Sequence, residues 1–321
     1  MKKTIIALGA ITGAVGAAAF YGFHEWAYRA LIHSDYKVPQ SLSKAISENK
    51  AGDASDLAAL GKKWMNDHGY KKYNMLNKDG NMLTAYLFQP KKKSNVYVFA
   101  SHGYRSEGIG EWCFFAKYYV ETLGYNLFVV DHQGQGNSTG KYLGFGSFES
   151  RDGLQWLNFM IDKFGKKIKI ILHGISMGSA TVMLMTGAKS LPENVKFTIA
   201  DCGYTSALNE FNYKLEALGV PTRPLVPYLS KKNIKRAGYD FQKDTDALAA
   251  VGQAKIPMLF IHGTKDKFVP TYMVHELFDN CSAPYKDKLL VEGADHAESY
   301  RIDKESYEKK IKEFADMFIK K

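Results

Sequence analysis

The stretch of sequence that decides the fold is residues 168–180, IKIILHGISMGSA. Its first part, Ile168–Leu172, is an apolar run typical of a buried strand, and Ala180–Thr186 beyond it has helical character. The residues between them, 174–178, match the pattern G-x-S-x-G, which is short enough to arise by chance on its own. In this strand-to-helix context the pattern predicts a strained turn that exposes the hydroxyl of Ser176. An ordinary glycine-flanked turn serine is the alternative.

Around this segment, short apolar runs alternate with stretches of helical period. An alternating hairpin comes first, with arms Lys72–Leu76 and Leu83–Gln89. The apolar runs that follow are Val96–Ala100, Leu127–Val130, Ile168–Leu172, Phe197–Ala200, Met258–Ile261 and Lys288–Val291. The helical stretches between them include Glu111–Leu123, Phe148–Phe164 and Ser176–Ala188. Such alternation predicts an α/β fold with a mostly parallel sheet and helices on both faces.

Polar signatures stand directly after several of these runs. They are Ser101-His102-Gly103, Asp131–Gly134, His173–Ser176, Asp201–Gly203 and His262–Thr264. Because ligands of parallel sheets bind beyond the carboxyl ends of the strands, we expect the chemistry at this edge. The longest gap in the alternation, about residues 204–245, is rich in proline and aromatic residues and predicts a small cap insertion over the site.

The candidate base is His296, in the loop Gly293–Ala297 after the last predicted strand. A serine hydroxyl is a poor nucleophile until a base removes its proton, and Ser176 therefore needs such a partner. His296 taken alone could be a surface-loop residue, but the combination with Ser176 favours a catalytic role. The other histidines near strand ends are interpreted as hydrogen-bonded supporting groups: His102, His132, His173 and His262.

The candidate acid is Asp266, which follows the penultimate strand. A carboxylate there would hold the tautomer of His296 and stabilise the imidazolium. The chain order Ser176, Asp266, His296 is the one expected when the nucleophile stands on a G-x-S-x-G turn. Two alternatives remain open: Asp266 could cap the next helix, or Asp201 could be the acid instead.

Two backbone N–H groups are candidates for stabilising a tetrahedral intermediate. Met177, one residue past the nucleophile, supplies the first. Tyr104, just beyond His102-Gly103, supplies the second from the loop after Val96–Ala100. The Tyr104 side chain can also line the substrate pocket, and the two roles are compatible.

At these residues the chain resembles the membrane-anchored or secreted α/β-hydrolases of Gram-positive bacteria, which are related to the serine aminopeptidase and Bem46-like hydrolases. The resemblance covers roughly residues 70–321. Its matching segments are Ser101–Tyr104, Asp131–Ser138, Leu172–Ala180, Ala200–Ser206, Pro257–Pro270 and Gly293–Ser299. It implies the α/β-hydrolase fold.

The leading interpretation of function is a carboxylesterase that acts on small or medium acyl esters through an acyl-enzyme. A peptidase or amidase could use the same triad, with a peptide as its substrate. An acyltransferase that acts on a surface polymer could use the same acyl-enzyme. A non-catalytic binding module is disfavoured, because such a protein has no need of Ser176, Asp266 and His296 together. No metal and no cofactor are expected, since the triad supplies nucleophile, base and charge stabilisation.

Composition narrows the remaining classes. The three cysteines, Cys113, Cys202 and Cys281, have no spacing typical of a disulfide framework or a zinc site. The formal charge of +10 is spread over the chain without a basic stripe, so no nucleic-acid partner is expected. A solvated basic surface, or attraction to an anionic envelope or lipid surface, accounts for the charge.

The N-terminus predicts a membrane segment. Lys2 and Lys3 precede an uncharged, mostly apolar run, Thr4–Phe23, and about 20 helical residues rise about 30 Å, enough to span a bilayer. The lysines would stay cytoplasmic, which leaves the catalytic domain outside the cell. A secretory signal cleaved near Ala19 is the alternative, and a buried soluble helix is a third.

These predictions divide the chain into three parts. Residues 1–23 are a transmembrane anchor or signal segment, residues 24–70 are a helical lead-in, and residues 71–321 are the α/β-hydrolase domain with its cap insertion.

Overall fold

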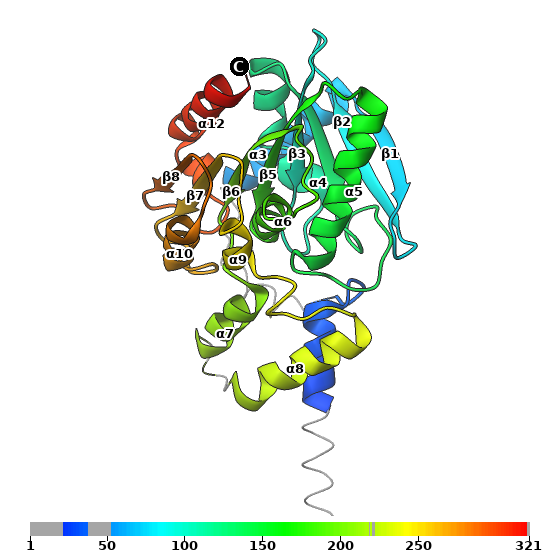
Figure 1. Cartoon of the computed structure of the whole chain (residues 1–321), viewed down its shortest axis with the longest axis vertical. Helices are drawn as coiled ribbons and strands as arrows, with labels where there is room; N and C mark the ends of the chain where they lie inside the picture. Colours follow the sequence, from blue (N-terminus) through cyan, green and yellow to red (C-terminus); the bar gives the residue numbers. More distant parts are fainter. Residues whose placement is uncertain (1–21, 38–52, 218, 220–221, 320–321) are drawn as a thin grey trace, which may run out of the picture.

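The computed structural model describes residues 22–37, 53–217, 219 and 222–319. Figure 1 shows a central sheet with helices on both sides and a smaller group of helices beyond one edge. The sheet has eight strands in the order β1-β2-β4-β3-β5-β6-β7-β8. The predicted α/β-hydrolase architecture, a mostly parallel sheet between helices, is confirmed.

The strands fall where the apolar runs predict them. β1 (Lys71–Leu76) and β2 (Met82–Phe88) form the antiparallel hairpin, and β2 also runs antiparallel to β4. All other neighbours in the sheet pair in parallel. The remaining strands are β3 (Val96–Ser101), β4 (Asn126–Asp131), β5 (Lys169–Ile175), β6 (Val195–Asp201), β7 (Met258–Gly263) and β8 (Lys286–Val291).

Alternating side chains of each central strand enter two separate cores, as a sheet covered on both faces requires. In β3, Val96 and Val98 face one core while Tyr97 and Phe99 face the other. The first core is closed by α3 (Asp53–His68), α4 (Gly108–Trp112) and α12 (Lys304–Phe318). The second is closed by α5 (Ser147–Phe164) and α6 (Met177–Thr186). The shorter helices α9 (Ala247–Val251), α10 (Tyr272–Asn280) and α11 (Ser299–Ile302) follow later in the chain.

The stretch predicted to be helical, Glu111–Leu123, is helical over most of its length but is interrupted. α4 ends at Trp112, residues 113–115 form a turn, and the π-helix η1 (Tyr118–Thr122) follows. α3 packs closely on this turn, since a Cβ on Gly61 would stand 2.3 Å from the carbonyl oxygen of Cys113. Apolar periodicity cannot reveal such a break, since the aromatic side chains on both sides of it still reach the same core.

The cap consists of α7 (Ala207–Ala217) and α8 (Thr222–Arg236), which lie within the predicted insertion, and of a helix at residues 22–32. Figure 1 shows the latter, in blue, against α8 at the end of the molecule opposite the C-terminus. Glu25 forms ion pairs with Lys232 and Arg236 of α8. The cap has an apolar core of its own, which includes Tyr28, Ile32, Phe145, Phe148, Phe211, Leu225, Leu229 and Phe241.

The residues predicted as a helical lead-in, 24–70, therefore pack in two different places. Residues 22–37 belong to the cap, whereas α3 packs on the sheet beside α4. The predicted anchor Thr4–Phe23 and the cleavage point near Ala19 lie outside the described residues, apart from Gly22 and Phe23. Within the described ranges, no helix is both long enough and apolar enough to cross a membrane.

Candidate active site

Ser176 stands on a strained turn between β5 and α6. Its backbone has φ 57° and ψ −117°, a left-handed conformation that costs a non-glycine residue about 1–3 kcal/mol. The flanking glycines allow the turn to close, because a Cβ on Gly174 would lie 2.0 Å from the carbonyl oxygen of Gly178. A Cβ on Gly178 would lie 2.1 Å from the carbonyl oxygen of Ser101. Both glycines of the G-x-S-x-G pattern are thus required by backbone packing.

The structure brings the predicted side chains of Ser176, His296 and Asp266 together. His296 Nε2 lies 2.8 Å from Ser176 Oγ, and His296 Nδ1 lies 2.7 Å from Asp266 Oδ2. A carboxylate can only accept hydrogen bonds, so Nδ1 donates to Asp266 and Nε2 is left to accept from the serine hydroxyl. The other carboxylate oxygen, Oδ1, accepts the N–H groups of Phe268 and Val269, each at 2.8 Å. The acid is therefore fixed on both of its oxygens.

Hydrogen bonds keep Asp266 ionised. Burial alone would raise its pKa, but donation from His262 and His296 outweighs burial and holds the pKa well below its ordinary value. His262 Nε2 donates to the carbonyl oxygen of Val269 at 2.9 Å and lies 3.3 Å from Asp266 Oδ2. A fully charged acceptor therefore faces His296 at neutral pH.

The structure places Asp266, rather than Asp201, against His296. Asp201 ends β6, and its Oδ2 accepts the hydroxyl of Tyr307 at 2.8 Å. Its Oδ1 has no hydrogen-bond partner among the described residues. Burial raises the pKa of Asp201 to about 6. Asp201 belongs to a buried network behind the site, in which Tyr307 also contacts His173 at 3.0 Å.

The histidines near strand ends occupy supporting positions. His102 Nε2 accepts the backbone N–H of His132 at 3.0 Å, and His132 Nε2 lies 2.9 Å from Ser101 Oγ. His173 Nδ1 contacts the hydroxyl of Tyr119 at 2.8 Å. Each ring is buried and hydrogen-bonded within the protein, in keeping with the predicted supporting role.

The two predicted oxyanion donors lie on either side of the nucleophile. Met177 is the first residue of α6, where backbone N–H groups have no helical acceptor. Gly103 lies against the serine, since a Cβ on Gly103 would be 3.3 Å from the Cβ of Ser176. Tyr104 follows Gly103 directly, so its N–H belongs to the loop that lies beside Ser176.

The ring of Tyr104 packs into the cap. It stacks on Phe145 with ring centroids 5.0 Å apart, and its hydroxyl donates to the carbonyl oxygen of Leu31 at 2.8 Å. The side chain therefore links the loop after β3 to the helix of residues 22–32.

Glu111 supports the same loop and was not predicted from the sequence. Its Oε1 and Oε2 accept the N–H of Gly103 at 3.0 and 3.1 Å. Burial raises the pKa of Glu111 to about 7. The two partners are eight residues apart across an irregular loop, whose shape no sequence pattern reveals.

A group of potential metal ligands coincides with the triad. Atoms of Cys202, Asp266 and His296 lie within 4.8 Å of one another. Two of the three are already hydrogen-bonded to each other, and burial raises the pKa of the Cys202 thiol well above its ordinary value. Because a metal needs the thiolate, this donor set fits a metal poorly.

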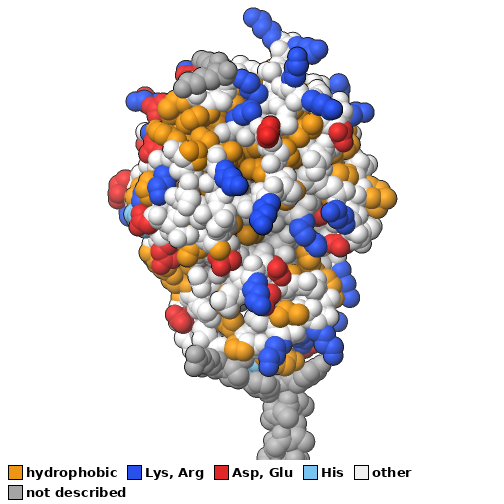
Figure 2. Space-filling model, viewed as in Figure 1, with side chains coloured by type: hydrophobic (Ala, Val, Ile, Leu, Met, Phe, Trp, Pro, Cys, Tyr) orange, Lys and Arg blue, Asp and Glu red, His pale blue; other side chains and the backbone are white. Residues whose placement is uncertain are grey.

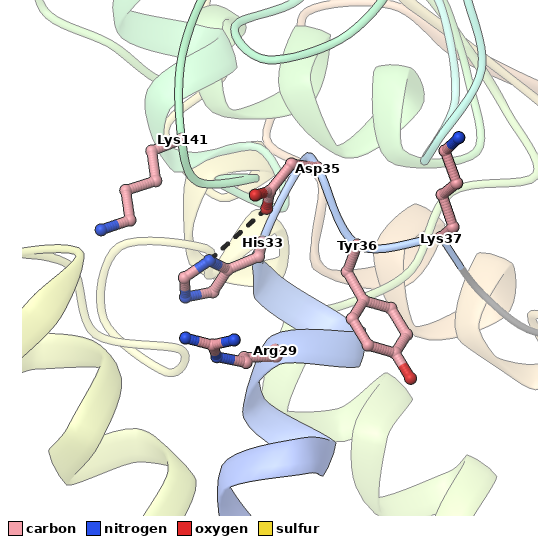
Figure 3. A pocket seen from close by; sticks show the side chains of 6 residues that line it. All are labelled: Arg29, His33, Asp35, Tyr36, Lys37 and Lys141. Carbon is pink, nitrogen blue, oxygen red and sulfur yellow. Dashed lines mark ion pairs between the residues drawn. The ribbon is translucent and has the colours of Figure 1, made fainter.

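Two cavities lie beside the N-terminal segment rather than at the triad. The larger, about 440 Å³, is shown in Figure 3 and is lined by Arg29, His33, Asp35, Tyr36, Lys37 and Lys141. The second, about 210 Å³, is lined by Ser34, Arg105, Ser106, Gly134, Gln135, Gly136 and Leu143. Figure 2 shows Lys and Arg side chains spread over the visible face. Ser176 itself is only 9% exposed.

Sequence comparisons match this chain to a family model and to curated relatives. A family model described as serine aminopeptidase, S33, matches residues 92–201. The uncharacterized protein YqkD of Bacillus subtilis is 31% identical over 195 residues, which are 60% of this chain and 63% of YqkD, less than two thirds of its length. The protein Bem46 of Schizosaccharomyces pombe is 24% identical over 68% of this chain and 67% of its own.

Solved structures share the fold. An esterase of Pyrococcus furiosus, Pf2001, superposes with a TM-score of 0.64 at 17% identity, over 90% of this chain and 98% of the esterase. Alpha/beta hydrolase domain-containing protein 10 from mouse gives a TM-score of 0.56 at 18% identity, over 77% of this chain and 99% of its own.

The sheet, its helices and these neighbours show that the chain has the α/β-hydrolase fold. Within that class, the matches to the serine aminopeptidase model, YqkD and Bem46 confirm the resemblance to Bem46-like hydrolases. They support a function of the serine-hydrolase type.

Proposed function

We propose that the chain is a serine carboxylesterase that acts on small or medium acyl esters. One observation carries the proposal: an unbroken chain of hydrogen bonds runs from Asp266 through His296 to Ser176. This arrangement activates a hydroxyl for attack on an acyl carbon. The similarity in fold to an esterase adds support at the level of fold.

In the first half of the reaction, Ser176 Oγ attacks the ester carbonyl while His296 takes the hydroxyl proton. The carbonyl oxygen gains the negative charge, which the N–H groups of Met177 and Tyr104 stabilise. Loss of one such donor typically costs about 10²–10³ in kcat. The bond to the alcohol then breaks, His296 returns its proton to the leaving oxygen, and an acyl-enzyme remains. Asp266 stabilises the imidazolium throughout.

In the second half, water takes the place of the alcohol. His296 removes a proton from the water as it attacks the acyl carbon, and the same two N–H groups stabilise the second oxyanion. Collapse releases the carboxylic acid and returns the proton to Ser176. An alcohol that replaces the water at this step would make the enzyme an acyltransferase.

Aminopeptidase activity is a second candidate, and one feature of the cap favours it. Glu210 of α7 is buried, and neither of its carboxylate oxygens has a hydrogen-bond partner among the described residues. The Nζ of Lys214 lies 3.9 Å from Oε1 of Glu210 in an ion pair. The same Nζ lies over the ring of Phe268, and that ring packs on His296. Glu210 could therefore face a substrate ammonium near the triad. Burial raises the pKa of Glu210 to about 8, however, so at neutral pH it is mostly uncharged, and we favour the ester.

The test is a substrate screen of the purified full-length chain. p-Nitrophenyl esters of graded acyl length are assayed beside aminoacyl amides, with and without an added alcohol acceptor. We expect ester turnover to dominate. Faster cleavage of the amides would favour the aminopeptidase, and efficient transfer to the alcohol would favour the acyltransferase.

The nucleophile is tested in the same preparation. Ser176→Ala should remove nearly all turnover without loss of thermal stability, and a fluorophosphonate should label the wild type at Ser176, as mapped by mass spectrometry. A label on another serine would refute the assignment. A folded protein that neither turns over nor takes the label would instead be a binding module.

We propose further that Thr4–Phe23 anchors the chain in the cell membrane with the catalytic domain outside. Phe23 and Trp26, at the outer end of the helix of residues 22–32, are 47% and 41% exposed, and aromatic side chains at such a junction suit a membrane interface. Membrane fractionation with N-terminal sequencing tests this. Full-length protein in the membrane that is degraded by protease on intact cells supports it, and a shortened soluble product would indicate secretion.

A further inference from the structure

The loop that carries the proposed oxyanion donor contains a strained residue. Arg105 has φ 54°, a left-handed conformation that is unfavourable for a long side chain. The strain lies one residue past Tyr104, whose N–H is the proposed second oxyanion donor. A backbone held in such a state needs surrounding contacts that fix it.

The guanidinium of Arg105 makes those contacts. Its Nε donates to the hydroxyl of Tyr104 at 2.9 Å, and its Nη1 donates to the carbonyl oxygen of Tyr36 at 3.0 Å. Its Nη2 donates to the carbonyl oxygens of Ala30 at 2.9 Å and His33 at 2.8 Å. Four of the five N–H groups of an arginine are therefore used, in a planar fork that lysine cannot reproduce.

Two of these acceptors lie at the C-terminal end of the helix of residues 22–32: the carbonyl group of Ala30 belongs to its last turn, and that of His33 follows the helix directly. Such groups have no partner within a helix, and a cation at this end also complements the helix dipole. Arg105 donates to the carbonyl oxygens of Ala30 and His33. The Tyr104 hydroxyl donates to the carbonyl oxygen of Leu31 at 2.8 Å. The N–H of Leu143 donates to the carbonyl oxygen of Ile32 at 2.8 Å. The loop after β3 thus caps the helix.

The helix is itself a fixed support. Its Glu25 pairs with Lys232 and Arg236, and its Tyr28 hydroxyl lies 3.4 Å from Asn233 Oδ1. Tyr28 and Ile32 are almost fully buried in the cap core. The loop is therefore attached to a rigid element and not to a mobile surface segment.

We propose that Arg105 is a positioning residue: it ties the loop Gly103–Ser106 to the helix of residues 22–32 and so holds the Tyr104 N–H toward the oxyanion. The inference rests on the proposed esterase activity. It makes residues 22–37 part of the machinery that supports the active site, although they precede the α/β-hydrolase domain in sequence. Cleavage near Ala19 would preserve the tie, whereas loss of the helix would release the loop.

The test compares Arg105→Ala and Arg105→Lys with the wild type in the full-length chain. We expect Arg105→Ala to lower kcat about 10- to 100-fold with KM changed less than about threefold, because the oxyanion forms only after binding. Arg105→Lys should recover little of the loss. Binding of a trifluoromethyl ketone, whose adduct with Ser176 carries the same oxyanion, should weaken in parallel with kcat/KM.

Tyr104→Phe gives a second approach to the same tie, because it removes the hydroxyl that links Arg105 to Leu31. Tyr104→Phe should lower kcat about three- to tenfold. The double variant with Arg105→Ala should lose less kcat than the product of the two single losses, since both changes release the same loop.

A matched control separates positioning from cap stability. Tyr239→Phe removes another buried hydrogen bond of the cap, from its hydroxyl to the carbonyl oxygen of Leu143 at 2.7 Å, in which no residue of the loop Gly103–Ser106 takes part. It should lower the melting temperature but leave kcat within about twofold. The proposal is overturned if folded Arg105→Ala keeps the kcat of the wild type. It is also overturned if Tyr239→Phe loses as much kcat as Arg105→Ala. If Arg105→Ala does not fold, Arg105→Lys and Tyr104→Phe decide. A wild type without ester turnover would refute the proposed function instead.

Discussion

Strands β6 and β7 lie side by side and lead to two buried aspartates whose pKa values are shifted in opposite directions. Asp266, after β7, accepts hydrogen bonds from His296 and from the N–H groups of Phe268 and Val269, and its pKa is held well below the ordinary value. Asp201, at the end of β6, accepts from the hydroxyl of Tyr307, and burial raises its pKa to about 6. Burial raises the pKa of both carboxyl groups, and only at Asp266 do hydrogen bonds from His262 and His296 outweigh it.

The difference bears on which group can serve His296. An acid that stays charged over the working range can stabilise an imidazolium, whereas one that titrates near pH 6 is partly protonated in mild acid. Donors around the carboxylate therefore single out Asp266 among acids that follow neighbouring strands.

The largest effect is expected for Asp266→Asn. The change keeps the shape but turns a pure acceptor into a group that can also donate, which favours the wrong tautomer of His296. We expect a loss on the order of 10⁴-fold in kcat. Steady-state kinetics on the best ester, with circular dichroism for folding, measures it. If Asp201→Asn were worse for kcat with stability unchanged, the acid would have to be moved to Asp201.

Asp201→Asn should change stability rather than catalysis. The folded pKa, about 6, exceeds the unfolded value near 4, so the stabilisation present at low pH is lost as pH rises through 6. Asparagine keeps an acceptor for Tyr307 and removes the titration. The variant should gain on the order of 2 kcal/mol over the wild type between pH 4 and pH 8. Urea unfolding at both pH values measures the gain, and equal gains at both would contradict the assignment.

The smallest effect is expected for Glu111→Gln. Glu111 resembles Asp201 in its raised pKa, about 7, but it is partly exposed and accepts the N–H of Gly103. Glutamine keeps that acceptor, so kcat should fall no more than about threefold. The free energies of unfolding of variant and wild type, measured by urea unfolding, should separate as pH rises from 5 to 8, by about 1 kcal/mol after allowance for solvent screening. A constant difference would argue against titration of Glu111 in this range.

The sheet, Ser176 and its partners were predictable because their signals are local. Each strand is an apolar run of its own, and the elbow needs glycines only two residues from the serine. Parallel strands then bring their carboxyl ends to one edge, so residues after separate runs must converge. This geometry is why the sequence alone predicts Asp266 and His296 as the partners of Ser176.

The N-terminal part of the cap could not be predicted in the same way. Arg105 meets the helix across more than 70 residues, and its partners are backbone carbonyls that every residue possesses. Glu111 likewise binds a backbone N–H. No residue type or spacing marks such contacts, and the same holds for the break after Trp112, which leaves the apolar period intact.

The helix of residues 22–32 also has a consequence for how the protein is made. Tyr28 meets Asn233 after a gap of 205 residues, and Ile32 shares its core with Leu225. Translation at about 5–20 residues per second takes on the order of 10–40 s to cover that interval. Throughout it, the face of the helix that packs on α8 is without its partner. The yield of correctly folded protein should therefore depend on the speed of synthesis between Tyr28 and Asn233.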